Sequence, residues 1–374
     1  MRFHKIGGRT LPLKKPVILS VVGARPQFIK LAPLAPVLSR QFNHIVIHTG
    51  QHYDFEMSQV FFRELHLPKP KCNLNVGSGS HASMTANIMV RLEKLLGQLR
   101  PDIVLVYGDT NSTLAGALTT AKLQIPVGHI EAGLRSFRLD MSEEINRRLT
   151  DQVSSLLFCP TSTALKNLKK EGITAGVVHS GDLMYELIAE RLRDLKNSRL
   201  VLNRYQLAAG QFLLVTVHRA SNSDRKENLE TIVEILAALN ERVIFPVHPR
   251  TAANLKRFGL WRKLAAIVNM TVTEPLPYLD NLTLLMHARA VLTDSGGMQK
   301  EAAFIGTPCI TLRQETEWPE TLMQGNFLGG LSQRKIISRL NHLPQITTGG
   351  NYRIKGRKPS AIISLALKRF LGVR

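Results

Sequence analysis

The sequence has few cysteines and no C-x-x-C pair. Its three cysteines, Cys72, Cys159 and Cys309, are far apart among 374 residues. This spacing argues against a disulfide framework or a structural zinc site, and it favours a reducing compartment such as the cytoplasm. No apolar run approaches the roughly 20 residues that a membrane-spanning helix needs, so we expect no membrane span.

The chain also lacks the short motifs of several enzyme classes. It has no H-E-x-x-H or D-x-D pattern that would suggest a metal. It has no G-x-G-x-x-G for a dinucleotide and no G-x-S-x-G for a serine hydrolase. We therefore expect neither a metal nor another cofactor.

Negative charge is scarce, since 28 acidic residues stand against 49 lysines and arginines, which gives a net charge of +21. Such an excess is compatible with nucleic acid, an anionic membrane surface or acidic substrates. The basic residues are scattered and aromatic residues make up only 6% of the chain. This pattern favours a basic surface around an anion-binding enzyme over a specific nucleic-acid site.

Apolar runs that end in polar or glycine-containing turns alternate with helical patterns. This alternation predicts parallel, doubly wound sheets, and it restarts in the second half of the chain. We predict an α/β fold with two Rossmann-like domains facing a cleft, the arrangement called GT-B. The expected divisions are a basic tail (1–16), an N-terminal domain (17–185), a C-terminal nucleotide-binding domain (186–358) and a helix packing back toward the N-terminal domain (359–374). The stretch 200–211 fits no period and is a possible linker.

Polar side chains follow the predicted strands of the first half, where doubly wound sheets bind ligands. Arg25, His48, Asp109 and Glu131 all lie at or just past strand ends. Asp109 has the alternative role of a helix N-cap. Glu131 follows an apolar strand and should be partly buried, so it needs a partner, for which Arg135 is the nearest candidate.

Charged residues also crowd two helix starts. Arg25 and Lys30 could hold a diphosphate, or they could be solvated charges of a surface helix. Glu143 could serve beside Asp109 and Glu131 in proton transfer at a carbon atom, or it could simply pair with Arg147 four residues later.

A second candidate site lies in the stretch 291–308, which predicts a strand, a tight turn and a helix from about Met298. Ser295-Gly296-Gly297 would let the first N–H groups of the helix point at a phosphate, and Glu301 could accept hydrogen bonds from a ribose. The alternative is an ordinary turn with Ser295 as N-cap. His218 and His248 each follow a predicted strand and are either structural or part of a site.

Nine segments of the chain, in order, resemble the non-hydrolysing UDP-N-acetylglucosamine 2-epimerases. They are GARPQFIK, TGQHYD, YGDTNSTLAGAL, GHIEAGLRS, SEEINRRLTD, VTVHR, FPVHPRT, LTDSGGMQKEA and ETEWPE. The resemblance covers about residues 17–325. It implies a GT-B-like homodimer in the cytoplasm that needs no cofactor.

The resemblance also implies the reaction. The enzyme would interconvert UDP-N-acetylglucosamine and UDP-N-acetylmannosamine, for surface polysaccharide precursors. Loss of the C2 proton and expulsion of UDP would give 2-acetamidoglucal, to which UDP adds again with the opposite configuration at C2.

Residue roles can be carried over from the family motifs. The implied catalytic residues are Asp109, Glu131, Glu143 and His218. The implied substrate contacts are Arg25, Lys30, His248, Ser295, Gly296, Gly297 and Glu301. Gln51 and His52 match positions that bind an activating second UDP-N-acetylglucosamine in some members.

One motif departs from the commonest form of the family, which has arginine where this chain has Trp318. That arginine helps to hold the nucleotide. The TEW, QKEA and GQHYD segments resemble a branch that includes epimerases of UDP-2,3-diacetamido-glucuronate, so this sugar is an alternative substrate. A GT-B glycosyltransferase, a hydrolysing relative that releases UDP, and a non-enzymatic sugar-nucleotide sensor are the other hypotheses.

Overall fold

The computed structural model describes residues 3–6, 9–12, 15–51, 55–343 and 356–373. The chain forms two compact units, unit 1 (Met1–Leu187 with Lys355–Arg374) and unit 2 (Ile188–Ile354). The division falls inside helix α7 (Leu183–Asn197). The stretch 200–211 is not a linker, because it lies within unit 2 and contains helix α8 (Leu200–Arg204).

Unit 1 is built on a seven-stranded parallel sheet with the order β5-β4-β3-β6-β7-β8-β9. Its strands are β3 (Val17–Val22), β4 (Asn43–His48), β5 (Cys72–Asn73), β6 (Ile103–Tyr107), β7 (Val127–Ile130), β8 (Leu156–Cys159) and β9 (Val177–His179). The central strands β6 and β7 are fully buried. The edge strands β5 and β9 are short and buried only in part, so they leave no apolar run to predict them.

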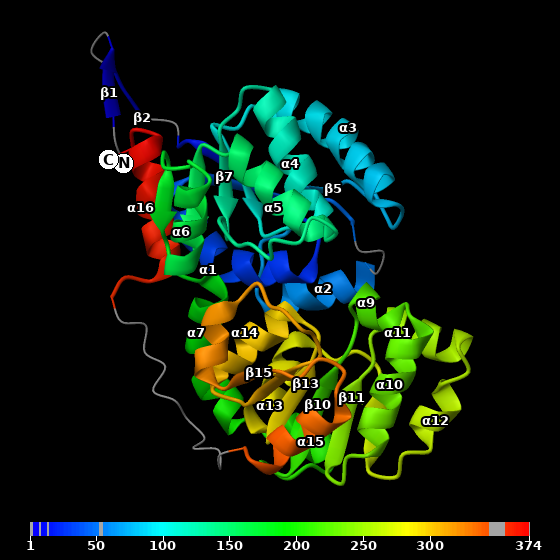
Figure 1. The fold of residues 1–374 in the computed structure, drawn as a ribbon. Coiled ribbons are helices and arrows are strands. Elements are labelled where there is room, and N and C mark those ends of the chain that lie inside the picture. The colour runs from blue at the N-terminus through cyan, green and yellow to red at the C-terminus, as the bar shows by residue number, and fades with distance from the viewer. Residues whose placement is uncertain (1–2, 7–8, 13–14, 52–54, 344–355, 374) are drawn as a thin grey trace. The chain divides into compact units, whose positions relative to one another are not determined.

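Helices cover both faces of this sheet (Figure 1). On one side α3 packs against α4 and α4 against α5, while α1 packs against α2 and α16. The helices are α1 (Arg25–Gln41), α2 (Phe55–Glu64), α3 (His81–Leu99), α4 (Asn111–Lys122), α5 (Ser142–Val153), α6 (Ser162–Lys170) and α16 (Pro359–Phe370). Apolar residues of β3, β6 and α3 form one shared core cluster.

Both chain ends contribute elements to unit 1. In the basic N-terminal segment, β1 (Phe3–Ile6) pairs antiparallel with β2 (Arg9–Pro12), which the sequence does not predict. At the other end, α16 is attached by side-chain hydrogen bonds. Ser360 donates from its hydroxyl and its backbone N–H to Glu186, at 2.6 and 2.8 Å, and Ser364 donates to Gln41 at 2.8 Å.

Unit 2 is built on a six-stranded parallel sheet with the order β12-β11-β10-β13-β14-β15. Its strands are β10 (Phe212–Thr216), β11 (Arg242–Pro246), β12 (Met270–Thr273), β13 (Ala290–Thr293), β14 (Cys309–Thr311) and β15 (Asn326–Leu328). Two parallel sheets, each covered by helices, confirm the predicted α/β fold with two Rossmann-like domains.

The helices of unit 2 fall into two groups of neighbours (Figure 1). Helices α9, α10, α11 and α12 pack among themselves, and α13 packs against α8 and α14. The remaining bounds are α9 (Ala220–Ser223), α10 (Lys226–Ala237), α11 (Pro249–Arg257), α12 (Trp261–Ala265), α13 (Tyr278–His287), α14 (Gly296–Ile305), the 3-10 helix η1 (Pro319–Gln324) and α15 (Gln333–Asn341). In the described ranges of both units, no helix combines the length and the apolar character needed to cross a membrane.

Candidate active site

Glu131 and Lys30 form a buried ion pair at the strand ends of unit 1. Lys30 Nζ lies 2.6 Å from Glu131 Oε2, and the two side chains are 7% and 9% exposed. The backbone of Glu131 has a φ of 75°, a left-handed conformation that costs a non-glycine residue roughly 1–3 kcal/mol. Such strain gathers at functional sites because the surrounding structure must enforce it.

The start of α1, which carries Lys30, is fixed from two directions. Gln27 Oε1 accepts the backbone N–H groups of Gly23 and Ala24 at 2.7 and 3.0 Å. Gln27 Nε2 donates to the carbonyl oxygen of Tyr107, at the end of β6, at 2.9 Å. A Cβ at position 23 would lie 1.8 Å from the Thr49 hydroxyl oxygen, so only glycine fits there. These contacts join the ends of three strands around Lys30.

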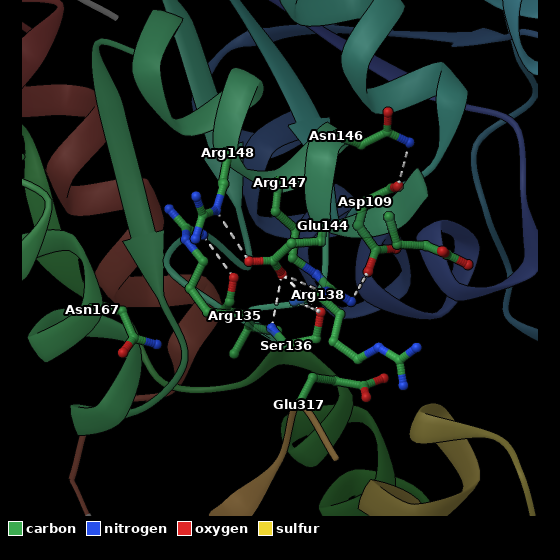
Figure 2. Close-up of polar contacts among 12 residues, drawn as sticks. Asp109, Arg135, Ser136, Arg138, Glu144, Asn146, Arg147, Arg148, Asn167 and Glu317 are labelled. Atoms are coloured by element: carbon green, nitrogen blue, oxygen red, sulfur yellow. Dashed lines mark hydrogen bonds and ion pairs between the residues drawn. The ribbon is translucent and has the colours of Figure 1, made fainter. Parts of the chain in front are cut away.

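Asp109 and Arg147 form another acid–cation pair next to a strand end of unit 1, with Arg147 Nη2 at 2.5 Å from Asp109 Oδ2. The Nη1 atom of the same guanidinium lies 3.2 Å from Glu144 Oε2. Glu144 also pairs with Arg148 and accepts the N–H of Ser136 (Figure 2). Burial raises the pKa of Glu144, but the Ser136 N–H and Arg147 outweigh it, and the pKa lies below its ordinary value. Glu144 is thus an ionised anchor that orients Arg147 toward Asp109.

The pairing of these carboxylates differs from two expectations. Arg135 does not pair with Glu131; it contacts Asp151 at 2.8 Å and Glu171 at 2.7 Å. Arg147 pairs with Asp109 and Glu144, while Glu143 accepts a hydrogen bond from the Ser142 hydroxyl at 3.2 Å. Glu143 nevertheless lies in the first turn of α5, the helix that supplies Arg147.

Asp109 and Glu131 follow the ends of two neighbouring strands. Strands β6 and β7 are neighbours, with Tyr107 opposite Ile130. A Cβ built on Gly108 would lie 3.4 Å from both Glu131 Oε2 and Lys30 Nζ, so the Glu131 carboxylate sits above the residue that precedes Asp109. A small pocket lined in part by Lys30, Glu131 and Asp182 opens at this place.

Gln51 forms hydrogen bonds within unit 1: its Oε1 accepts the N–H of Ser112 at 3.0 Å and the Ser112 hydroxyl at 2.6 Å. His52, the other position implied in activation, lies outside the described residues. His48, a further strand-end residue, is buried and stacks on Phe28 with ring centroids 5.3 Å apart. Arg25 places its guanidinium 5.4 Å from the centre of the Phe61 ring.

In unit 2, Asp294 organises the loop that follows β10. Its carboxylate accepts the backbone N–H of His218 and of Arg219, each at 3.0 Å, and the Asn222 amide at 3.1 Å. The His218 ring lies 3.7 Å from the same carboxylate and is 39% exposed. We did not predict Asp294, although it directly follows β13 in LTDSGG.

His218 and His248 lie side by side, with ring centroids 5.5 Å apart. His248 also caps α11, because its Nδ1 accepts the N–H of Arg250 at 3.2 Å. The helix α14 begins at Gly296, two residues earlier than predicted, with the Ser295 hydroxyl accepting the N–H of Met298 at 3.3 Å. The glycine turn thus stands at a capped helix N-terminus, whose dipole favours an anion.

A carboxylate between two arginines lies beside this turn and escaped prediction. Glu317 contacts Arg219 at 3.0 Å and Arg313 at 2.9 Å. A Cβ on Gly296 would stand 2.3 Å from Glu317 Oε1, so a larger residue there would displace this carboxylate from Arg219. The next residue, Trp318, is buried and its ring centroid lies 3.9 Å from Lys300 Nζ, a cation–π contact.

Among the described residues, no group of three or more histidine, cysteine, aspartate or glutamate side chains could hold a metal ion. Two parallel sheets covered by helices, acid–cation pairs at strand ends and a capped glycine turn are the features of a two-domain α/β protein with a candidate anion site. The family model described as UDP-N-acetylglucosamine 2-epimerase matches residues 37–352. The chain belongs to this family, whose members are isomerases.

Similar proteins agree with this assignment. A UDP-N-acetylglucosamine 2-epimerase homologue of Methanococcus maripaludis is 49% identical over 339 residues, 90% of this chain and 95% of that protein. The UDP-2,3-diacetamido-2,3-dideoxy-D-glucuronate 2-epimerase of Pseudomonas aeruginosa is 45% identical, over 86% of this chain and 90% of that protein. The crystal structure of the Methanocaldococcus jannaschii UDP-GlcNAc 2-epimerase with UDP-GlcNAc and UDP matches with a TM-score of 0.86. The two sequences are 40% identical, and the match covers 95% of this chain and 99% of that chain.

Proposed function

We propose that this protein inverts C2 of a UDP-N-acetylhexosamine, interconverting UDP-N-acetylglucosamine and UDP-N-acetylmannosamine. The C2 proton is removed as the bond from C1 to the UDP oxygen breaks, which gives 2-acetamidoglucal and UDP. UDP then adds again at C1 and a proton returns to the opposite face of C2. The reaction is balanced without an oxidant, a reductant or water.

The observation that carries this proposal is the pair of strand-end carboxylates, each held by its own cation. Epimerisation needs one group that takes the C2 proton and one that returns a proton on the other face. Asp109 with Arg147 and Glu131 with Lys30 supply two such groups at neighbouring strands. Each cation holds its carboxylate in place by an ion pair. We assign proton transfer to Asp109 and Glu131, with Glu143 as a third candidate.

We assign the nucleotide to the glycine turn of unit 2. Ser295, Gly296 and Gly297 present the N-terminus of α14 to a diphosphate. Glu301, buried in the second turn of the same helix, is our candidate for the ribose hydroxyls, and His248 is a further contact. In unit 1, Arg25 remains our candidate for the phosphates. His218, oriented through the Asp294 loop, is our candidate for a proton donor to the departing UDP.

Lys30 changes role in this proposal. The family resemblance places it among the substrate contacts, whereas its Nζ lies on Glu131. We propose that it keeps the Glu131 carboxylate charged and correctly oriented, whether or not it also touches the nucleotide.

A second substrate is favoured by one specific observation. Trp318 replaces the arginine of the commonest family form, and it lies against Lys300. UDP-2,3-diacetamido-glucuronate carries the same UDP and the same C2 chemistry, and a relative named for this substrate is 45% identical. We propose it as the alternative substrate of the same reaction.

We further propose that the protein works as a homodimer in the cytoplasm. An apolar surface supports the dimer: Phe137 and Leu139 are exposed in the loop before α5, and Ile145 and Leu149 are exposed on that helix. Exposed apolar clusters of this kind commonly mark protein interfaces. Light scattering after size-exclusion chromatography should give twice the monomer mass of 41.7 kDa; a monomer at micromolar concentration would contradict the dimer.

The experiment is product analysis with UDP-N-acetylglucosamine and with the diacetamido-glucuronate analogue, for the wild type, Asp109→Asn and Glu131→Gln. Loss of a positioned acid or base typically costs about 10²–10⁴-fold in rate, so both variants should lose at least about 100-fold in kcat. Glu230→Gln is the matched control, because Glu230 forms an exposed ion pair with Lys263 in unit 2. Its kcat should equal that of the wild type.

Three outcomes would overturn the proposal. Full activity in both variants would refute the residue assignment. Net release of UDP would favour a hydrolysing relative. A requirement for an acceptor would favour a glycosyltransferase.

A further inference from the structure

His129 lies fully buried in the middle of β7 and bridges two other elements. Its Nε2 lies 2.7 Å from the carbonyl oxygen of Gly108, just past the end of β6. Its Nδ1 lies 2.6 Å from Asp151 Oδ1 on α5. The proposed reaction assigns no role to either side chain.

Asp151 is in turn held by the turn that follows β7. Its Oδ2 accepts the N–H of Gly133 at 3.1 Å and lies 2.8 Å from Arg135 Nη1. Arg135 is fixed by a two-point contact with Glu171, at 2.8 and 2.7 Å. Burial raises the pKa of Asp151, but His129 and Arg135 outweigh it, and the pKa lies below its ordinary value.

The partners determine where the ring hydrogens are. A carbonyl oxygen can only accept, so Nε2 of His129 donates to Gly108. Asp151 already accepts two N–H groups on Oδ2, which favours the ionised carboxylate, so Nδ1 of His129 donates to Oδ1. His129 therefore uses both ring nitrogens as donors and cannot rotate without losing a buried hydrogen bond.

The two backbones that this ring connects carry the proposed acid and base. Gly108 directly precedes Asp109, and His129 stands two residues before Glu131. Both Gly108 and Glu131 have left-handed backbones, with φ of 64° and 75°. Glycine adopts many backbone conformations without strain, so the hydrogen bond from His129 to the Gly108 carbonyl restricts a residue whose backbone is otherwise free to turn.

We propose that His129, oriented by Asp151, is a positioning residue that fixes the relative placement of the Asp109 and Glu131 carboxylates through the Gly108 carbonyl. This inference rests on the proposed epimerisation. A misplacement of about 1 Å costs on the order of 100-fold in rate, so loss of the Gly108 contact should lower kcat by about that factor and leave KM nearly unchanged.

Two substitutions separate the two contacts. In His129→Gln the side-chain NH2 occupies the place of Nε2, so the donor to Gly108 is kept and the donor to Asp151 is lost. In His129→Asn the NH2 occupies the place of Nδ1, so the donor to Asp151 is kept and the donor to Gly108 is lost. A positioning role predicts that His129→Asn loses about 100-fold in kcat, whereas His129→Gln loses less than about 10-fold.

A merely structural role predicts the reverse order. Asp151 is a buried charge, so removal of its partner in His129→Gln is the more destabilising change. The double variant His129→Gln with Asp151→Asn guards against a failure to fold, because it removes the buried charge of Asp151 together with its partner. It should stay within about 10-fold of the wild-type kcat.

The assay is steady-state epimerisation, with thermal unfolding measured for each variant. Wild-type kcat in His129→Asn, or a 100-fold loss in the folded double variant, would overturn the inference and leave the proposed function intact. Absence of turnover in the wild type would instead refute the proposed function, and with it the reaction that His129 is proposed to serve.

Discussion

Replacement of Lys30 by methionine should lower kcat, because Glu131 loses its cation, and should also lower the stability of unit 1. Methionine keeps most of the length of the side chain and removes its charge. The perturbation therefore acts on one contact, the 2.6 Å ion pair between Lys30 Nζ and Glu131 Oε2.

The magnitude follows from the distance and the burial. At an effective dielectric constant of about 20, two charges at this distance attract by about 6 kcal/mol before desolvation. Because both side chains are buried, removal of one partner costs about 3–5 kcal/mol of the free energy of unfolding. A buried carboxylate that has lost its cation is pushed toward its neutral form, which cannot accept a proton. We therefore expect kcat to fall by about 10²–10⁴-fold.

Hydrogen–deuterium exchange of peptides from α1 and β7 measures the loss of stability next to Lys30 and Glu131. Both tryptophans, Trp261 and Trp318, lie in unit 2, so tryptophan fluorescence reports that unit separately. Exchange should rise in unit 1 while the fluorescence transition of unit 2 stays in place. Lys263→Met, which breaks an exposed ion pair in unit 2, is the matched control and should change neither.

The double variant Lys30→Met with Glu131→Gln completes the test. It replaces the ion pair by a neutral pair, so it should regain much of the stability while kcat stays low. Wild-type exchange and wild-type kcat in Lys30→Met would refute the role that we give to this pair.

Three further predictions concern the surroundings of the two sites. Gly23→Ala puts a Cβ 1.8 Å from the Thr49 hydroxyl oxygen and should cost about 1–3 kcal/mol of stability by chemical denaturation; unchanged stability would show that this turn can relax. Burial lowers the pKa of His44 to about 4, so the unfolded chain binds more protons between pH 4 and 6.5. Stability should fall by about 3 kcal/mol as pH drops through that window, and His44→Gln, which can still bond Ser20, should flatten the slope. Asp294→Ala removes the acceptor of two backbone N–H groups after β10 and should cost about 1–3 kcal/mol; its thermal unfolding should then fall below that of the wild type, and no change would contradict the anchoring role.

The central strands could be predicted from the sequence because burial on both faces makes them apolar throughout. Strands β6 (Ile103–Tyr107) and β8 (Leu156–Cys159) are buried at every position. The edge strands β5, β9 and β15 could not be predicted, since strands of two or three residues leave no period in the sequence.

The sequence predicts the positions of the candidate site but not the partners of each side chain. Strand ends indicated Asp109 and Glu131, because parallel strands gather their carboxyl ends at one edge of the sheet. The partner of Glu131 is Lys30, about 100 residues earlier in the chain, and not the nearby Arg135. Which side chains meet across a fold depends on helix placement and side-chain direction, which sequence spacing does not supply.

The central claim, reversible proton transfer at C2, is tested most directly by proton NMR of the purified protein with UDP-N-acetylglucosamine in deuterium oxide. We predict that the C2 proton signal disappears by exchange with solvent while UDP-N-acetylmannosamine appears. If this sugar is silent, the diacetamido-glucuronate analogue should show the same exchange. An unchanged C2 proton in both sugars, with a folded protein, would contradict the claim.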